Sequence, residues 1–200
     1  MMDDLNHRAF LALAARLDLG SAGLLGAHAL AQGLVFFAPA TLALLWLFGD
    51  RRDRRADVAA LLTAVVALAV AYLLSHLVVH PRPFMVEPVR NFLNMPSDTS
   101  FPSGQATLFF ALAVSFAWHR APGCPWLGLL FLACGIAVGW SRILLGAHYP
   151  LDVAGSALIA LAAGPIIHLR PGAWVLSRMT ALAERLYGVV RPPGGMHHEH

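Results

Sequence analysis

A serine–arginine pair followed by a histidine and an aspartate is the part of this sequence with the clearest capacity for chemistry. The segment contains Ser141 and Arg142, then His148, then Asp152 four residues after the histidine. If a helix begins near residue 149, positions i and i+4 share a face, so the carboxylate can reach one imidazole nitrogen and leave the other free to attack. His148 is therefore a candidate nucleophile, and Asp152 is its candidate orienting partner.

A second polar segment, residues 80–105, supplies groups suited to binding phosphate. Arg82, together with Arg142 of the first segment, can hold phosphate oxygens through two N–H groups each. Ser103 and Gly104 stand where a helix is expected to begin, and free N–H groups and the positive end of the helix dipole favour an anion there. The remaining candidates for this site are His80, Pro83 and Ser141.

Each of these features also has a structural explanation when it is taken alone. An arginine near the end of a membrane helix commonly anchors lipid headgroups, Pro-Ser-Gly is commonly a turn followed by a helix cap, and a lone histidine can be an interface residue. Their ordered occurrence in two loops favours a phosphate site.

The elements that must position these residues are membrane helices. The 200 residues are 58% hydrophobic and 12% charged, which is too apolar for a soluble domain. A span needs roughly 20 apolar residues, and five windows meet or approach that length. We therefore predict an all-α integral membrane protein with about five transmembrane helices, in residues 20–49, 58–79, 104–118, 126–140 and 151–169.

Segments at both ends of the chain have the character of interfacial helices. Residues 5–17 form the first, and residues 173–190 form the second, in which apolar residues recur at helical spacing between charged ones. We expect a retained N-terminal segment (1–19), a membrane domain (20–169), and an amphipathic helix with a disordered tail (170–200). Met-His-His-Glu-His ends the tail and could chelate metal weakly or be a disordered end.

Arginine placement predicts the orientation, because positively charged loops stay in the cytoplasm. Four arginines within residues 51–55, with Arg120 and the arginines of residues 170–191, place these segments and the C-terminus in the cytoplasm. The loops at 80–103 and 141–150 then face the exterior, or the periplasm of a bacterial inner membrane. The lipid bilayer is the expected partner and no nucleic acid is expected, since the arginines are scattered and form no binding run.

The motifs resemble those of the type-2 phosphatidic acid phosphatase superfamily: Lys-x6-Arg-Pro, Pro-Ser-Gly-His and Ser-Arg-x5-His-x3-Asp. The third is complete from Ser141 to Asp152, and Arg82-Pro83 and Pro102-Ser103-Gly104 match parts of the others. Residues 81–84, 100–103 and 148–152 are most similar to the bacitracin-resistance type undecaprenyl-diphosphate phosphatases. The resemblance covers roughly residues 20–169.

Two positions depart from the family pattern. Ser75 stands where the first motif has lysine, a charge for which His76 or His80 is a conceivable substitute. Gln105 stands where the second motif has the histidine that is thought to protonate the leaving group. Glutamine can donate a hydrogen bond but cannot deliver a proton.

The resemblance implies that His148 attacks the terminal phosphorus, oriented by Asp152, to form a phosphohistidine. Arg82, Ser103, Gly104 and Arg142 would hold the phosphate, with Gln105 at the general-acid position and no cofactor or metal. Two cysteines in different settings and one acidic residue in the second loop offer no metal pattern. The expected function is hydrolysis of undecaprenyl diphosphate during cell-envelope synthesis.

Three alternatives stay open at this point. The substrate could be a phospholipid phosphate, either phosphatidic acid or phosphatidylglycerophosphate. The chain could be an impaired or engineered form that binds lipid phosphates without turnover, because of Gln105. A transporter is disfavoured, since the few mid-membrane polar residues, His28, Gln32 and Ser75, form no evident pathway.

Overall fold

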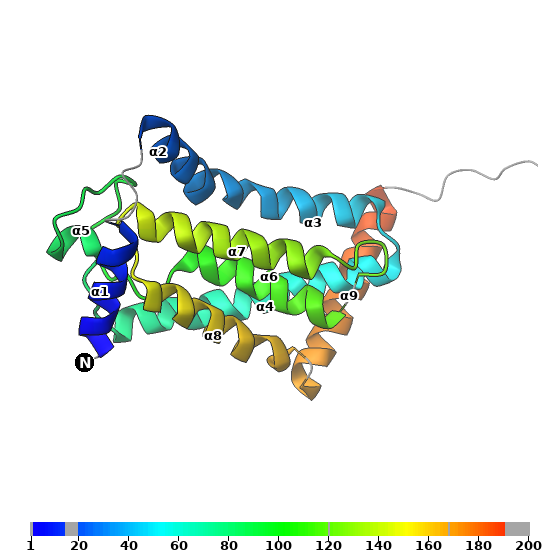
Figure 1. Cartoon of the computed structure of the whole chain (residues 1–200). Helices are drawn as coiled ribbons and strands as arrows, with labels where there is room; N and C mark the ends of the chain where they lie inside the picture. Colours follow the sequence, from blue (N-terminus) through cyan, green and yellow to red (C-terminus); the bar gives the residue numbers. More distant parts are fainter. Residues whose placement is uncertain (1, 15–19, 120, 168, 191–200) are drawn as a thin grey trace, which may run out of the picture.

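The computed structural model describes residues 2–14, 20–119, 121–167 and 169–190, and the regular elements in this part of the chain are helices joined by loops (Figure 1). An isolated bridge between Pro81 and Thr99 is the only β-type pairing among the described residues. The helices are α1 (Met2–Ala14), α2 (Ser21–His28), a π-helical turn (Ala29–Gly33), a 3-10 turn (Leu34–Phe36), α3 (Phe37–Phe48), α4 (Arg51–Leu77), α5 (Pro83–Val86), α6 (Gly104–His119), α7 (Leu127–Leu144), α8 (Pro150–Ile166) and α9 (Arg170–Val190).

Helix α6 is the centre of the bundle and packs against α4, α7 and α8. Phe116 of α6 stacks on Phe131 of α7, Phe109 of α6 lies tilted against the same ring, and all three are buried. Small side chains let α4 approach α6 closely, as is common between membrane helices. The buried stripe on α4 consists of Ala56, Ala60, Ala64, Ala67 and Ala71.

The structure confirms an all-helical chain with several long apolar helices. Three continuous helical segments, Ser21–Phe48, Arg51–Leu77 and Leu127–Leu144, are long and apolar enough to cross a membrane. The other two predicted spans correspond to α6 and α8, which have 16 and 17 residues. At about 1.5 Å per residue each is shorter than the ~30 Å hydrocarbon layer. The count of five spans therefore stays a prediction.

Two predicted loops are partly helical. The arginine-rich segment after the first span is the first turn of α4, because Asp50 caps that helix, accepting hydrogen bonds from the backbone N–H groups of Arg52 and Asp53 at 2.7 and 2.8 Å. Helix α7 continues to Leu144, four residues beyond the predicted end. Arg142 is therefore held on a helix and not on a loop.

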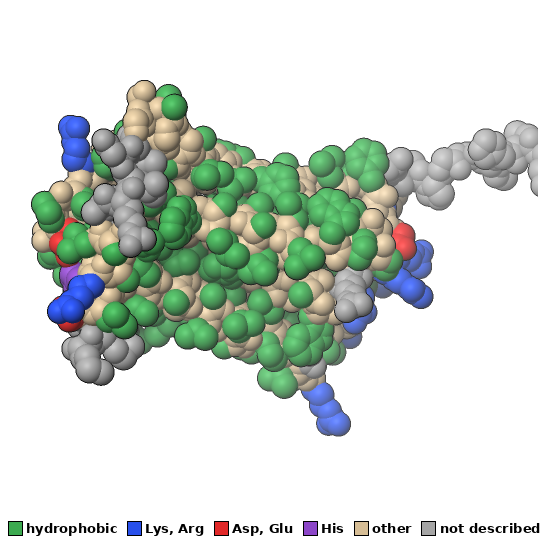
Figure 2. Space-filling view, in the orientation of Figure 1, with side chains coloured by type: hydrophobic (Ala, Val, Ile, Leu, Met, Phe, Trp, Pro, Cys, Tyr) green, Lys and Arg blue, Asp and Glu red, His purple; other side chains and the backbone are tan. Residues whose placement is uncertain are grey.

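Charged side chains gather at the two ends of the bundle, and on the face shown in Figure 2 the band between them is apolar. At one end lie α1, α5 and the connections into α6 and α8; at the other α9 crosses the bundle (Figure 1). Helix α9 begins at Arg170, three residues before its predicted start, and packs on α4. Residues 15–17 of the N-terminal segment, Arg120 and the tail beyond residue 190 lie outside the described residues.

Candidate active site

The predicted site residues meet at the end of the bundle where α6 and α8 begin and α7 ends (Figure 1). Arg142 lies in the last turn of α7, and Asp152 lies in the first turn of α8. Between them the chain turns sharply at Gly146, whose φ of 73° suits glycine. The reversal places His148 beside the start of α8.

His148 is buried, with 2% of its surface exposed. Its Nδ1 donates to the backbone carbonyl of Ser100 at 2.7 Å and lies 3.7 Å from Asp152 Oδ2. With the proton on Nδ1, the lone pair is on Nε2, which is buried without a hydrogen-bond partner among the described residues. Burial lowers the pKa of His148, and the charges of Arg142 and Arg82 lower it further, against the opposing effect of Asp152. The imidazole is therefore neutral at pH 7 and can act as a nucleophile.

Asp152 organises the start of α8 as well as the site. Its Oδ2 accepts the backbone N–H of Tyr149 at 2.7 Å, and the carboxylate is 1% exposed. Asp152 lies near His148 as predicted, but the two side chains are 3.7 Å apart and form no hydrogen bond, because His148 Nδ1 donates its proton to the Ser100 carbonyl. A backbone acceptor carries no residue-type signal, so the sequence could not reveal this role of Ser100.

Two buried arginines flank the histidine. Arg82 donates from Nε to Asp98 at 2.7 Å and from Nη1 to the Ala147 carbonyl at 3.1 Å. Arg142 donates from Nη1 to Gln105 Oε1 at 3.0 Å, and its Nε is buried without a partner among the described residues. Two guanidinium groups at 5% and 6% exposure need anions, and Asp98 with 55% exposure is a loose partner for one of them. The site is therefore suited to an additional anion.

The Ser103–Gln105 segment begins α6 as predicted, but its groups are used differently. The Ser103 N–H, expected to face an anion, donates instead to Ser156 Oγ at 3.0 Å, and the Ser103 hydroxyl is buried without a partner among the described residues. Gly104 is the first residue of α6, where backbone N–H groups have no intrahelical acceptor. Gln105 holds Arg142, so it has a positioning contact in this structure.

The three remaining candidates, His80, Pro83 and Ser141, have different roles in the structure. His80 does, since its Nδ1 lies 2.8 Å from Ser100 Oγ and 3.3 Å from Asp152 Oδ1. Pro83 is buried and begins the short helix α5. The Ser141 hydroxyl instead donates to its own helix, at 2.8 Å from the Val138 carbonyl.

The structure also distinguishes His76 from His80, the two conceivable substitutes for the first-motif lysine that Ser75 replaces. The ring of His76 contacts the Tyr72 carbonyl at 2.8 Å and the Ser75 hydroxyl at 3.3 Å, both on its own helix. His80 is therefore the histidine of the pair that meets Asp152.

Helix α1 covers this site from outside, a contribution that the sequence did not reveal. Phe10 is fully buried with its ring edge against Tyr149, and Asn6 Oδ1 accepts the N–H of Leu151 at 3.1 Å. Burial, followed by the charges of Glu87 and Asp152, raises the pKa of Tyr149 to about 12. The tyrosine is therefore a neutral packing residue.

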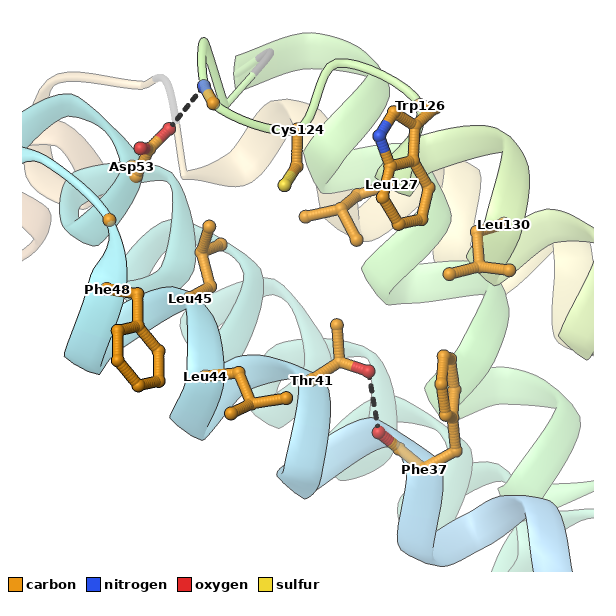
Figure 3. Close-up of a pocket in the computed structure, with 12 residues that line it drawn as sticks. Phe37, Thr41, Leu44, Leu45, Phe48, Asp53, Cys124, Trp126, Leu127 and Leu130 are labelled. Carbon is orange, nitrogen blue, oxygen red and sulfur yellow. Dashed lines mark hydrogen bonds between the residues drawn. The ribbon is translucent and has the colours of Figure 1, made fainter.

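Hollows in the surface of the described chain lie both near the site and far from it. A groove of about 470 Å³ between α3 and α7 lies at the opposite end, near Asp53 and Gly123 (Figure 3). A smaller hollow of about 370 Å³ borders Asp98 and His76, next to Arg82. No group of three His, Cys, Asp or Glu side chains in the described ranges is arranged to hold a metal ion.

Comparisons with known proteins identify the family of this chain. The PAP2 superfamily matches residues 56–175. The chain is 33% identical over 162 residues to YbjG of Escherichia coli K12, named a candidate undecaprenyl-diphosphatase, covering 80% of each chain. It is also 33% identical over 132 residues to the undecaprenyl-diphosphatase BcrC of Bacillus subtilis, covering 66% of this chain and 65% of that protein. The crystal structure of Aquifex aeolicus LpxE superposes with a TM-score of 0.58 at 24% identity, covering 81% of this chain and 93% of that one, and shows the shared fold.

Proposed function

Because this chain belongs to the PAP2 superfamily of lipid phosphatases, we propose that it hydrolyses undecaprenyl diphosphate to undecaprenyl phosphate and phosphate through a phosphohistidine. It is a multi-pass membrane protein with relatives named as undecaprenyl-diphosphatases. The similarity to those relatives supports the substrate, and the site supports the mechanism.

The observation that carries the proposal is the buried Nε2 of His148, which has no hydrogen-bond partner among the described residues and lies beside two buried arginines. A buried polar atom without a hydrogen-bond partner costs free energy, and a bound ligand is one explanation for such an atom. Within the described part of the chain, Arg142 Nε and the Ser103 hydroxyl also have no hydrogen-bond partner. An anion bound to these donors and facing the lone pair of His148 would satisfy them.

In the proposed reaction, His148 Nε2 attacks the terminal phosphorus while Arg82 and Arg142 neutralise the phosphate oxygens. The bond from phosphorus to the bridging oxygen breaks, and the lipid monophosphate leaves with the electron pair. Asp152 stabilises the positive charge that develops on the imidazole. Water then attacks the phosphohistidine, the P–N bond breaks, and inorganic phosphate is released.

Gln105 favours a diphosphate over a phosphate monoester. A lipid monophosphate, with a second pKa of roughly 6, leaves as an anion at neutral pH with little help from an acid. A lipid alkoxide needs a proton, and general acid catalysis is worth about 10² to 10⁴ in rate. A site with glutamine at the general-acid position is therefore better suited to the diphosphate.

We place the site on the outer face of a bacterial inner membrane, with α9 and the C-terminus in the cytoplasm. The arginines at the start of α4 lie at the opposite end of the bundle from the site (Figure 1). Positive charge retained in the cytoplasm supports this orientation. The enzyme would then regenerate a carrier lipid for cell-wall synthesis, an activity associated with bacitracin resistance.

The second candidate function is hydrolysis of a phospholipid phosphate, phosphatidic acid or phosphatidylglycerophosphate. A third candidate is a catalytically impaired form that binds lipid phosphates. Gln105 supports it, because its hydrogen bond to Arg142 occupies one N–H donor of that guanidinium. The retained contacts of His148 and Asp152 favour an active enzyme, because a binding protein needs no oriented nucleophile.

Phosphate release by the purified protein in detergent tests these functions. Undecaprenyl diphosphate and phosphatidic acid are compared with and without EDTA, beside a His148→Ala control. Release that survives EDTA, prefers the diphosphate and disappears in the control is expected. No release from either lipid would refute the enzymatic proposal and leave lipid-phosphate binding as the function.

A further inference from the structure

We propose that His80 is a second catalytic histidine, which carries the proton that Gln105 cannot deliver. The inference rests on the proposed phosphatase function and adds a residue to the same site. The observation behind it is that the rings of His80 and His148 both lie near the buried carboxylate of Asp152.

Ser100 and Asp152 join the two imidazoles. His148 Nδ1 contacts the Ser100 carbonyl at 2.7 Å, and His80 Nδ1 contacts the Ser100 hydroxyl at 2.8 Å. One oxygen of Asp152, Oδ2, faces His148 at 3.7 Å, and the other, Oδ1, lies 3.3 Å from His80 Nδ1. Each histidine therefore has its Nδ1 directed at the same pair of residues.

Two hydrogen bonds hold the backbone of His80 in place. The carbonyl of His80 accepts the Ser100 N–H at 2.7 Å, and its N–H donates to Thr99 Oγ1 at 3.1 Å. Residues 80 and 82 flank the bridged residue Pro81, and alternate residues of an extended segment project to the same side. His80 therefore lies on the side of this segment that carries Arg82.

Three other described groups near the site are poor proton carriers. Tyr149 is buried with its pKa raised to about 12, and Asp98 is paired with Arg82 at 2.7 Å. Gln105 does not ionise. The side chain of His80 is 22% exposed, against 3% for His148, so it is the more open of the two rings and accessible to a leaving group or water.

The proton balance of the reaction follows from this arrangement. As His148 Nε2 bonds to phosphorus and the bond to the leaving oxygen breaks, His80 Nε2 gives its proton to that oxygen. When water attacks the phosphohistidine, its proton passes to His80 Nε2, the P–N bond breaks, and the electron pair returns to His148. Both histidines are then restored.

The test is His80→Asn, because the asparagine amide can occupy the place of Nδ1 and keep the contacts to Ser100 and Asp152 while removing Nε2. Farnesyl diphosphate and farnesyl phosphate are compared, since they share one hydrocarbon chain and differ in leaving group. His76→Asn is the matched control, because His76 lies at the same end of the helix bundle as His80 but contacts its own helix.

We expect His80→Asn to lower kcat on the monophosphate by about 10²-fold or more, and on the diphosphate by less than about tenfold. Adding Gln105→His to the variant should restore monophosphate turnover. Equal losses on the two substrates, no loss on either, or a wild type inactive on the monophosphate alone would overturn the role of His80. Activity that survives His148→Ala, or a wild type inactive on both, would instead refute the proposed function itself.

Discussion

Asp152→Asn separates the two effects that the structure assigns to the surroundings of His148. The Ser100 carbonyl at 2.7 Å holds the proton on Nδ1, so we expect the variant to keep the reactive tautomer. What the variant loses is a negative charge 3.7 Å from the ring. At this distance and an effective dielectric constant of about 20, the attraction to an imidazolium is about 4 kcal/mol.

That attraction corresponds to at most about 10³ in rate, since each ~1.4 kcal/mol is tenfold. The loss should stay below the ~10⁴ seen when the same change disturbs the tautomer of a catalytic triad. Asparagine can still accept the Tyr149 N–H through its amide oxygen, so the melting temperature should change little.

Single-turnover phosphate release from undecaprenyl diphosphate measures the effect, with His148→Ala as the inactive reference. A loss as large as that of His148→Ala would refute the assignment of the tautomer to Ser100. An unchanged rate would refute the electrostatic role of Asp152.

Three further predictions concern different parts of the site. Because burial lowers the pKa of His148, kcat/KM should rise with pH through a midpoint that lies below the ordinary imidazole pKa of about 6.5. A midpoint at or above that value would contradict the effect of burial. Phe10→Ala should lower the free energy of unfolding by about 3 to 5 kcal/mol, because the ring is fully buried. Thermal melting in detergent measures this loss. Leu11→Ala on the same helix is the control and should cost much less, because Leu11 is 39% exposed. Gln105→His should change kcat on lipid diphosphates by less than about tenfold, because their leaving group departs without an acid. A large gain on diphosphates would count against the explanation of Gln105 by leaving-group chemistry.

Much of the fold follows from hydrophobic patterning, because long apolar segments that must satisfy their own backbone hydrogen bonds in lipid become helices. Boundaries that depend on caps were less predictable. Helix α4 begins at Arg51, since the Asp50–Asp53 capping box outweighs the polarity that indicated a loop. The two interruptions of the first long helix, the π turn at Ala29–Gly33 and the 3-10 turn that follows it, carried no signal that we recognised.

The sequence by itself determined the chemical groups: two arginines, a histidine and an aspartate, spaced so that helix ends present them together. Their types and short-range spacing are local properties, and local geometry at the start of α8 places Asp152 near His148. Only the tertiary structure decided which partner each group takes. The Ser100 carbonyl, the contact of His80 with Asp152, and the cover that α1 provides over Tyr149 join residues distant in the chain. Such contacts depend on how the helices pack, and a backbone acceptor is the same atom at every residue type, so neither can be read from composition or periodicity.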